Sequence, residues 1–597
     1  MPDKRFFWCT SFLLFLLFFS CDGPQDISTQ WNQSSGPYGG FIQCFGGNGE
    51  IILAGTEGGG IFKSADKGGK WLAVNNGLGD SNIYSIERFG QSFFAGTNNG
   101  LFVSGDGGNI WTRCAPDHSG DFIAALSAGT DGLYAGTSRG IFLIRFVNGG
   151  WQSTPAGPGS ASITSLAVRG TFIAAGTEES GVFVSTDGGA TWKQSGAELT
   201  NRGVTSLEAR ENGLFAGTYG GGVFHSANNG TNWQQINNGL KDLQVYALEW
   251  TNGSLYAGTA QGVYAWKNDM TGWKYVSSGL QNSFVYSLYE YGGLLLAGTN
   301  GGGVYAFDDK TLSWSVRNEG LSNAFVGSIL PTEKGIIAGT NGAGVFISTD
   351  DGDTWLSRNS GFTSLNIFDL AIRESSIFAG TNGGGVYISN DNGESWSPSN
   401  HGLTNVHVYA LETNGTQVYA GTFGGGVFVS NDNGENWKPV NTGLSNHYIS
   451  SFAIREDAVF AASYGSGVYR LAGNRESWIP VNSGLSLLQV FALAAGPDGI
   501  IAGTPGAGVY ETANNGVQWE PANNGLLELR INTLAAINGH ILAGTYSGGI
   551  YRSINNGNSW QQFNEGMQGI DTYALAISGK YALAGTNGRG IWKRRIR

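Results

Sequence analysis

Short apolar runs recur along this 597-residue chain, each bounded by glycine, asparagine, aspartate or serine. One copy contains the runs Val408–Glu412, Gln417–Ala420, Gly426–Ser430 and Trp437–Val440. Short runs rich in β-branched and aromatic residues, separated by turn residues, are typical of β-strands. The copy therefore predicts four antiparallel strands, which we name a to d from the inside of a blade to its outside.

The repeat is easiest to follow in strand b, which ends in Ala-Gly-Thr or a close variant. Its alanine recurs every 40 or 41 residues, fourteen times: Ala54, Ala95, Ala135, Ala175, Ala216, Ala257, Ala297, Ala338, Ala379, Ala420, Ala461, Ala502, Ala543 and Ala584. A period near 40 built from short strands predicts an all-β propeller with one blade per repeat. Because propellers usually hold four to eight blades, we expect two tandem seven-bladed propellers.

The two ends of the chain complement each other. Trp31 is in phase with the tryptophans that begin the later d strands, whereas the chain ends after strands a, b and c of its last blade. For two rings, we expect the strand of Trp31 to complete the sheet of Ala297. The strand of Trp314 would then open the second ring and complete the sheet of Ala584.

The turn between strands c and d carries the pattern Ser-x-Asp-x-Gly-x-x-Trp. A turn aspartate can accept backbone N–H bonds, glycine allows positive φ, and tryptophan supplies an apolar plate. The aspartates are Asp66, Asp106, Asp187, Asp350, Asp391 and Asp432. Asparagine replaces them at Asn228, Asn514 and Asn555. A neutral amide suits a turn acceptor better than a calcium ligand, so we expect these positions to lock hairpins.

This pattern resembles the Asp-box, or BNR, repeat of sialidases, sortilin, xyloglucanases and the photosystem II assembly factor. The resemblance covers nearly the whole chain after its amino terminus and implies propellers. The architecture is most similar to the xyloglucanase family, which has two tandem seven-bladed propellers with a substrate cleft between them. The assembly factor instead uses one ring and a basic patch, which does not fit an acidic chain of fourteen repeats.

The resemblance to xyloglucanases implies two catalytic positions, each directly after strand b of the first blade of a ring. These positions are Glu57 and Asn341 in this chain. Inverting hydrolysis needs both a general acid and a general base, and Asn341 cannot titrate. Glu57 alone is a weak catalytic candidate, so we expect no catalytic pair here. A glycoside hydrolase of xyloglucanase type, with its acid and base relocated, remains the alternative.

We expect a binding surface on the face that carries the b-to-c turns and the d-to-a loops. The residue after each Ala-Gly-Thr would ring this face and, unlike the box, it varies from blade to blade. The candidates are Glu57, Glu178, Tyr219, Asn341, Phe423, Tyr464 and Tyr546. Exposed aromatics suit sugar stacking or a protein hot spot; the alternative is that these are ordinary turn residues.

Repeats of 40 or 41 residues leave no room for the long inserted loops that usually carry propeller active sites. The six histidines show no paired spacing, and we expect no metal and no cofactor. A net charge of -12 and a pI near 5.0 argue against nucleic-acid partners. These features favour a monomeric binding or scaffold protein, with a polysaccharide or an envelope protein as its partner.

The amino terminus resembles a bacterial lipoprotein signal. Lys4 and Arg5 precede the apolar run Phe12–Phe19, which is followed by Ser20 and Cys21. This run has export-signal length and is too short to span a bilayer. Cys21 would be the lipidated residue, so the membrane would be met only through the lipid anchor. The alternative is an ordinary secretion signal with a coincidental cysteine.

These interpretations divide the chain into four parts. Residues 1–20 are the expected signal peptide and residues 21–29 a lipidated tether. Residues 30–310 are the expected first propeller and residues 311–597 the second. The expected location is the outer membrane or the cell surface, as an exported lipoprotein.

Overall fold

The computed structural model describes residues 30–36, 38–159, 161–199, 203–211, 213–267, 271–537, 539–567 and 569–596. The proposed lipid site at Cys21 lies outside these residues. Within them, the one helical segment is the 3-10 turn η1 (Pro116–His118). A search of the described segments for a helix long and apolar enough to cross a bilayer found none.

The strands form fourteen four-stranded antiparallel sheets, one for each repeat. A representative blade contains β38 (Val408–Thr413), β39 (Val418–Thr422), β40 (Gly426–Ser430) and β41 (Lys438–Pro439), paired in chain order. Strand b is buried along its whole length in this blade, because neighbouring sheets cover both of its faces. The outer strand is short and exposed.

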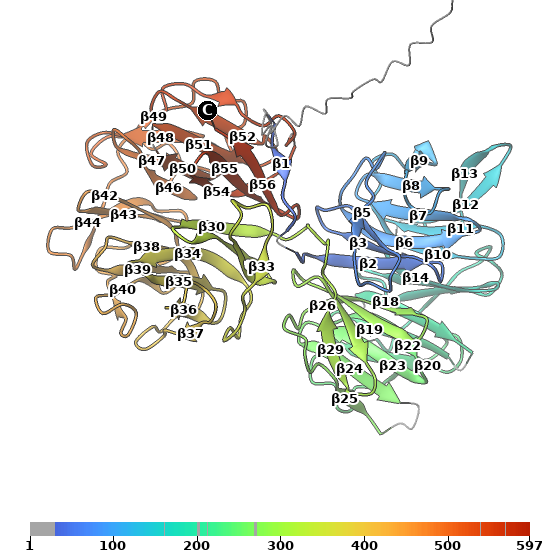
Figure 1. The fold of residues 1–597 in the computed structure, drawn as a ribbon. Helices are drawn as coiled ribbons and strands as arrows, with labels where there is room; N and C mark the ends of the chain where they lie inside the picture. The colour runs from blue at the N-terminus through green and yellow to red at the C-terminus, as the bar shows by residue number, and fades with distance from the viewer. Residues whose placement is uncertain are drawn as a thin grey trace, which may run out of the picture.

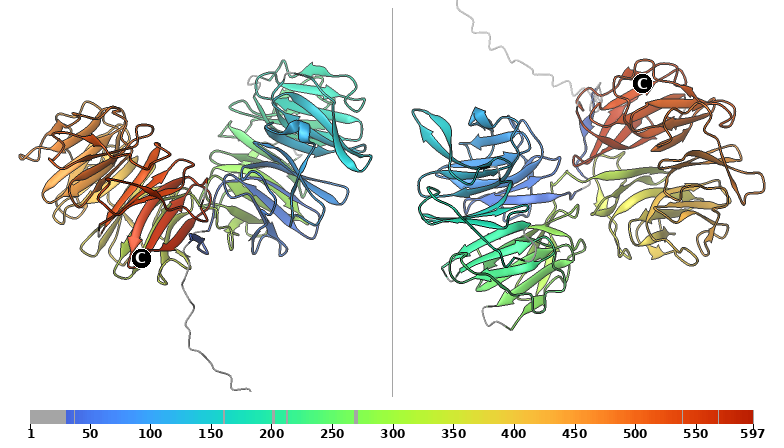
Figure 2. Two further views of the ribbon diagram at one scale, coloured as in Figure 1. Left: turned by 90° about the horizontal axis from the view of Figure 1, so that it is seen from above. Right: turned by 180° about the vertical axis from the view of Figure 1, so that it is seen from behind.

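The sheets form two rings that lie side by side and are inclined to each other (Figures 1 and 2). In the first ring, the inner strands pack in order and the last contacts the first. These strands are β2 (Ile42–Gly47), β6 (Ile83–Phe89), β10 (Ile123–Ala128), β14 (Ile163–Arg169), β18 (Val204–Arg210), β22 (Val245–Thr251) and β26 (Val285–Tyr291). The ring therefore holds seven blades, as the sequence predicted.

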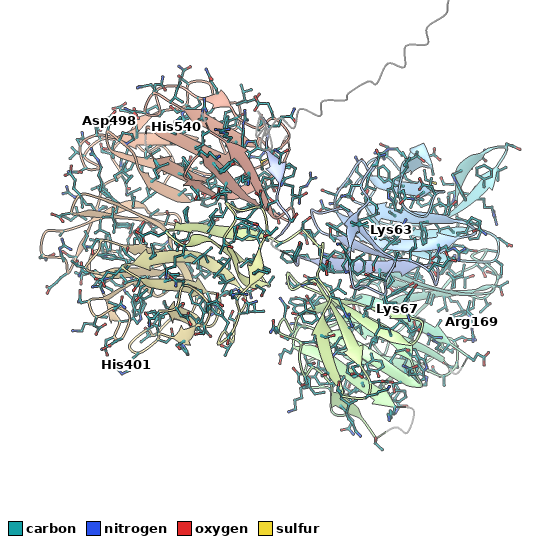
Figure 3. All side chains as sticks on the ribbon, viewed as in Figure 1. Lys63, Lys67, Arg169, His401, Asp498 and His540 are labelled. Carbon is teal, nitrogen blue, oxygen red and sulfur yellow. The ribbon has the colours of Figure 1, made fainter. Side chains whose placement is uncertain are left out.

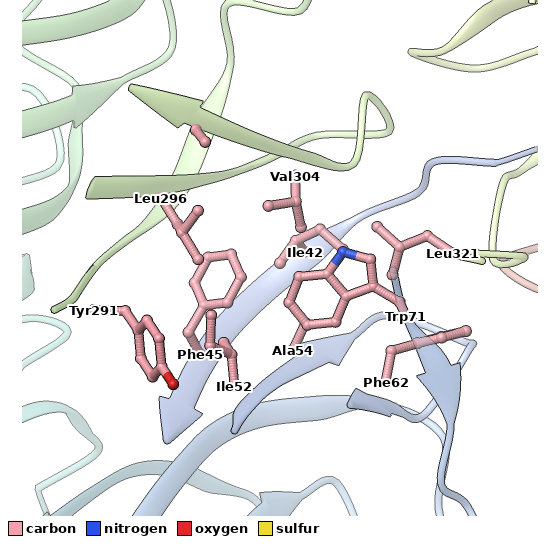
Figure 4. Close-up of a cluster of buried hydrophobic side chains, with 11 residues drawn as sticks. Ile42, Phe45, Ile52, Ala54, Phe62, Trp71, Tyr291, Leu296, Val304 and Leu321 are labelled. Atoms are coloured by element: carbon pink, nitrogen blue, oxygen red, sulfur yellow. The ribbon is translucent and has the colours of Figure 1, made fainter. Parts of the chain in front are cut away.

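An apolar cluster forms where the first and last blades of the first ring meet (Figure 4). Ile42 and Trp71 of the first blade contact Leu296 and Val304 of the last, and all four are buried. The Ser287 hydroxyl also donates to the Ile42 carbonyl at 3.2 Å. Side-chain packing thus closes this ring.

The second ring has the same order of inner strands, and its last inner strand also contacts its first. The strands are β30 (Val326–Thr332), β34 (Ile367–Arg373), β38, β42 (Ile449–Arg455), β46 (Ala492–Ala495), β50 (Ile531–Ile537) and β54 (Thr572–Ser578). The chain is therefore an all-β protein of two tandem seven-bladed propellers.

The outer strands at the ring junction pair differently from our expectation. Strand β29 (Ser313–Val316), which contains Trp314, pairs with β28 (Val304–Asp308) in the sheet of Ala297. The prediction that Trp314 would complete the sheet of Ala584 is therefore wrong. The expected boundary between residues 310 and 311 falls inside this hairpin. A four-residue turn closes the hairpin, and a short loop costs less entropy than recruiting a distant strand.

The strand of Trp31 lies in the second ring, not the first. Strand β1 (Asn32–Gln33) pairs with β56 (Ile591–Arg595), which belongs to the sheet of Ala584. Figure 1 shows this blue strand beside the red end of the chain. The sequence correctly indicated that the amino terminus supplies a missing d strand. It assigned that strand to the wrong ring, because the last blade of the first ring already has its own.

The chain consequently passes between the rings twice, at residues 34–41 and 317–325. The two segments run together: the Gly39 N–H donates to the Leu321 carbonyl at 2.9 Å. Gly40 adopts a φ of +131°, and a Cβ there would lie 2.3 Å from Asn323 Nδ2. Only glycine fits at this crossing.

The placement of Trp31 can be tested by replacing it with alanine. Trp31 is 2% exposed and packs against Phe563, so its loss should cost roughly 3–5 kcal/mol. We expect faster hydrogen exchange in β54 and β56, with unchanged exchange in β26 and β28. Trp111→Ala is the matched control, because this buried tryptophan lies in the first ring. Loss of protection in β26 and β28 of the Trp31 variant would contradict the observed pairing.

Candidate functional site

The Asp-box lies in the turn between strands c and d and forms a closed set of hydrogen bonds. The Ser430 hydroxyl donates to Asp432 Oδ1 at 2.8 Å, and the Asn436 N–H donates to the same oxygen at 2.9 Å. The Gly434 N–H donates to Ser430 Oγ at 2.8 Å. The side-chain and backbone hydrogen bonds from Asn436 lower the pKa of Asp432 to about 2.

The asparagine version of the box has the same geometry. Asn228 Oδ1 accepts from the Ser226 hydroxyl and from the Asn232 N–H, both at 2.9 Å. Since a neutral amide oxygen makes both bonds, the turn does not require a charge. The arrangement fits a hairpin lock.

No metal centre is evident among the described residues, where no three or more histidine, cysteine, aspartate or glutamate side chains could hold an ion together. The histidines are scattered: Figure 3 shows His401 and His540 on different sides of the second ring. One ordered pair is His118 Nδ1 with Asp121 Oδ2, 2.8 Å apart, which ties η1 to the loop that follows it. That pair stabilises a loop.

At each candidate position, the residue after Ala-Gly-Thr is held beside the residue that precedes strand a. The Phe423 N–H donates to the His407 carbonyl at 2.9 Å, and the Tyr464 N–H donates to the Tyr448 carbonyl at 2.9 Å. The remaining candidates make the equivalent bond: Glu57 to Phe41, Glu178 to Ser162, Tyr219 to Gly203, Asn341 to Phe325 and Tyr546 to Arg530. We call these two positions together the rim of a ring.

Four rim candidates are aromatic and turned to solvent. Tyr219 and Phe423 are each 53% exposed, Tyr464 is 49% exposed and Tyr546 is 43% exposed. Glu178 is also exposed. Exposure of large apolar side chains at one recurring position indicates a surface able to bind a ligand.

Two further candidates, Glu57 and Asn341, lie where the rings meet. The Arg589 guanidinium donates through Nε to the Gly58 carbonyl at 3.1 Å, and Asn282 Nδ2 donates to the Gly342 carbonyl at 3.2 Å. Each candidate's loop thus touches the opposite ring. Glu57 accepts a hydrogen bond from Gln43 Nε2 at 3.1 Å. Asn341, at the paired position, has an amide side chain that does not titrate and cannot act as a general acid or a general base.

A cavity of about 500 Å³ opens at the same junction. Its polar lining comes from both rings: Gln33, Asn75, Asp80, Ser81, Ser322 and Arg589. Asp80 is the one carboxylate among the lining residues. The cavity therefore does not display a pair of acids for hydrolysis.

The second ring carries an arc of aromatic side chains that sequence reasoning missed in part. Phe368 stacks on Tyr409 with ring centroids 4.2 Å apart, and Tyr409 lies 5.3 Å from Phe423. Phe423 meets Tyr448 edge to face at 4.4 Å. Phe368 and Tyr409 occupy the residue that a β-bulge adds to strand a.

The arc continues in the next blades. Tyr464 is parallel to Phe491, with centroids 5.8 Å apart, and the Arg530 guanidinium lies 4.5 Å from the centre of the Tyr546 ring. The inner-strand tyrosines Tyr84, Tyr246, Tyr286, Tyr409 and Tyr573 are half-buried, and burial raises their pKa values. The sequence contained a signal for these side chains: an aromatic residue recurs at the second position of strand a in blades of both rings.

Comparison with known proteins agrees with this architecture. Residues 183–194 and 387–398 match the family of the BNR/Asp-box repeat. A comparison with curated proteins gave no match. The chain thus contains BNR/Asp-box repeats within a propeller architecture like that of xyloglucanases.

Several solved structures share the fold. An ancestral GH74 enzyme matches with a TM-score of 0.64 and 16% identity, over 95% of this chain and 99% of that one. The GH74 xyloglucanase from Xanthomonas campestris matches with a TM-score of 0.62 and 16% identity, over 95% of this chain and 100% of that one. PorZ, a surface component of the type-IX secretion system of Porphyromonas gingivalis, matches with a TM-score of 0.58 and 14% identity, over 95% of this chain and 87% of that one. At these identities the likeness establishes the fold alone.

The box geometry predicts a specific pH dependence for an Asp187→Asn/Asp432→Asn double variant. Hydrogen bonds, first of all from the Thr191 and Asn436 side chains, lower the pKa of each aspartate to about 2, from about 3.9 in an unfolded chain. The stability that each carboxylate contributes is therefore complete above about pH 4 and is lost as pH falls towards 2. We expect the difference in urea midpoint between the wild type and the variant to shrink over that interval.

Asp457→Asn is the control for this measurement, because Asp457 is exposed and lies outside the boxes. The difference in urea midpoint between this control variant and the wild type should not change over the same pH interval. A wild-type advantage over the double variant that persists undiminished at pH 2 would contradict the assigned role.

Proposed function

We propose that this chain is a non-catalytic binding protein of the cell envelope, anchored by lipid at Cys21. Its ligand is a polysaccharide or an envelope protein, and the rim of the second ring is its binding surface. The observation that carries the proposal is the aromatic arc, which places Phe423 and Tyr464 in solvent on neighbouring blades and Tyr546 in solvent two blades further on. The Glu178 and Tyr219 rim positions of the first ring would form a secondary surface.

Folding does not require aromatic residues at these positions, which supports a binding role. The same rim position holds Ser138, Ala260, Asn382 and Pro505 in other blades. The backbone bond to the residue before strand a is made by asparagine as well: the Asn382 N–H donates to the Asn366 carbonyl at 3.0 Å. Exposed aromatics therefore add nothing to the turn, and binding is the role that accounts for them.

The proposed anchor would hold the second ring near the membrane. Residues 22–29 separate Cys21 from the segment that begins β1, and eight residues span at most about 28 Å. Because β1 belongs to the second ring, the tether would emerge from that ring. Lipid anchoring requires more than one acyl chain to be stable, which a bacterial lipoprotein cysteine would supply.

Hydrolysis of a xyloglucan-like polymer is the second candidate function. It is favoured by the position of Glu57 beside the junction of the rings, where the Arg589 guanidinium contacts its loop. It is opposed by Asn341 at the paired position, since an inverting mechanism needs a second titratable group.

A reducing-sugar assay on the purified mature chain separates the two functions. With tamarind xyloglucan and barley β-glucan, we expect no release above the buffer blank, because a catalytic pair is lacking. Glu57→Gln should leave the result unchanged. Release of oligosaccharides by the wild type, with loss in Glu57→Gln, would establish the hydrolase and reject the binding proposal.

The anchor has its own test. In a bacterial host, the wild-type protein should partition with membranes and show an amino-terminal peptide carrying lipid on Cys21 by mass spectrometry. Cys21→Ala should abolish lipidation and release the chain, because no other cysteine occupies the lipobox position. Globomycin should block processing of the wild type. An unlipidated amino-terminal peptide would point to an ordinary secretion signal.

A further inference from the structure

The rim of the second ring exposes several apolar side chains, aliphatic as well as aromatic. The aliphatic ones are Leu527, which is 79% exposed, and Val406, Leu488 and Leu529, which are 36–41% exposed. They come from d-to-a loops, which backbone hydrogen bonds hold beside the b-to-c turns: the Gly467 N–H donates to the Leu488 carbonyl at 2.7 Å and the Gly508 N–H to the Leu529 carbonyl at 3.0 Å. We define the apolar patch as Val406, Phe423, Tyr448, Tyr464, Leu488, Leu527, Leu529 and Tyr546.

The first ring provides an internal comparison for the aliphatic positions. Val406 and Leu529 each stand two residues before strand a, and Leu488 stands four residues before β46; their carbonyls accept backbone bonds from the neighbouring turn. The equivalent residues of the first ring include Leu243, which is 37% exposed, but also Ser81 and Asp121, whose carbonyls make the same bonds at 2.9 and 2.8 Å. The fold thus works with polar side chains there.

Charge is almost absent from the patch, although the chain carries a net charge of -12. Arg530 and Glu528, at its edge, bond to each other with Nη2 and Oε2 2.8 Å apart. His407 Nδ1 lies 2.6 Å from Asn382 Oδ1. The polar side chains between the apolar ones are mainly amides such as Asn446. At the Tyr546 end of the patch, the Arg530 guanidinium lies 4.5 Å from the centre of the Tyr546 ring, and Asp571 Oδ1 accepts from the Ser547 N–H at 2.7 Å. The eight patch side chains themselves carry no charge, so an apolar ligand surface complements them.

We propose that the apolar patch binds a partner protein through an apolar, uncharged surface segment of that partner. This inference rests on the proposed binding function and names the class of its ligand. Four of the eight patch residues are valine or leucine, which bury well against apolar side chains but offer no flat face to a sugar ring. Exposed aromatic anchors with aliphatic neighbours, few charges and a polar edge describe the centre of a protein–protein interface.

Site-specific photo-crosslinking in intact cells of the source organism tests the inference. The photoreactive residue p-benzoylphenylalanine replaces Phe423 or Tyr464 in the full-length chain, and Phe146 of the first ring in the matched control. Phe146 lies in a c-to-d hairpin, outside the rim. The patch positions should yield adducts with one and the same protein, identified by mass spectrometry. The control, which is 60% exposed, should not form that adduct.

A second variant separates binding from folding. Adding Leu527→Asn and Tyr546→Asn to the Phe423 crosslinking chain should reduce its adduct by about tenfold or more, because a few buried anchors carry most of the binding energy of an interface. Asparagine already occupies the Tyr546 position in other blades, so the rings should stay folded, as circular dichroism and thermal unfolding would verify.

Three outcomes would overturn the inference. The first is the absence of a protein adduct from both patch positions, and the second is an equal adduct from position 146. The third is binding of neutral soluble polysaccharides, such as tamarind xyloglucan or dextran, that is lost in a Phe423→Asn/Tyr464→Asn variant. This last outcome would retain the proposed binding function and assign the patch to a glycan, whereas hydrolysis in the reducing-sugar assay would reject the function itself.

Discussion

Both rings depend on one interaction, the tryptophan that joins each blade to its predecessor. The Trp437 N–H donates to the His401 carbonyl at 2.8 Å, and its indole Nε1 donates to the Ser399 carbonyl at 2.7 Å. The backbone N–H and the indole N–H of this tryptophan thus satisfy two backbone acceptors of the preceding loop, while its ring fills the space between sheets. An unpaired buried polar group would cost more than such a bond gains, so a blade without this residue would leave the next loop unsupported.

The same interaction explains how the rings close. Trp71 in the first blade donates from its backbone to Glu319 and from its indole to Arg317, both after the seventh blade. In the second ring, Trp355 donates from its indole to Ser34 Oγ at 3.2 Å. The segment after β1 therefore accepts the indole hydrogen bond that a d-to-a loop accepts in other blades. Repeating contacts of this kind let a chain with short loops enclose two cores without inserted domains.

The sequence predicted the blade number, the strands and the two rings, because a period of 40 or 41 residues, alternating patterns and turn residues are local signals. It could not decide which ring receives Trp31, since the pattern around this residue fits any open blade edge. The turn after Asp308 lacks the serine and glycine of the box pattern, yet it closes an ordinary hairpin. On the surface, the varying residue after Ala-Gly-Thr identified Phe423 and Tyr464. Phe368 and Phe491 were missed. A β-bulge places Phe368 beside the rim, and Phe491 directly precedes β46, where its N–H donates to the Gly503 carbonyl at 2.9 Å.

Strand β1 has a consequence for how this protein is made. A chain that emerges amino terminus first can complete its first ring after roughly half of its length has appeared, since all seven sheets of that ring are contiguous in sequence. The second ring cannot close until β56 has been synthesised, because β1, which follows Trp31, pairs with that strand. A product truncated before β56 would leave β1 and the edge of β55 unpaired. Such an unpaired strand edge can pair with the corresponding strand of another molecule.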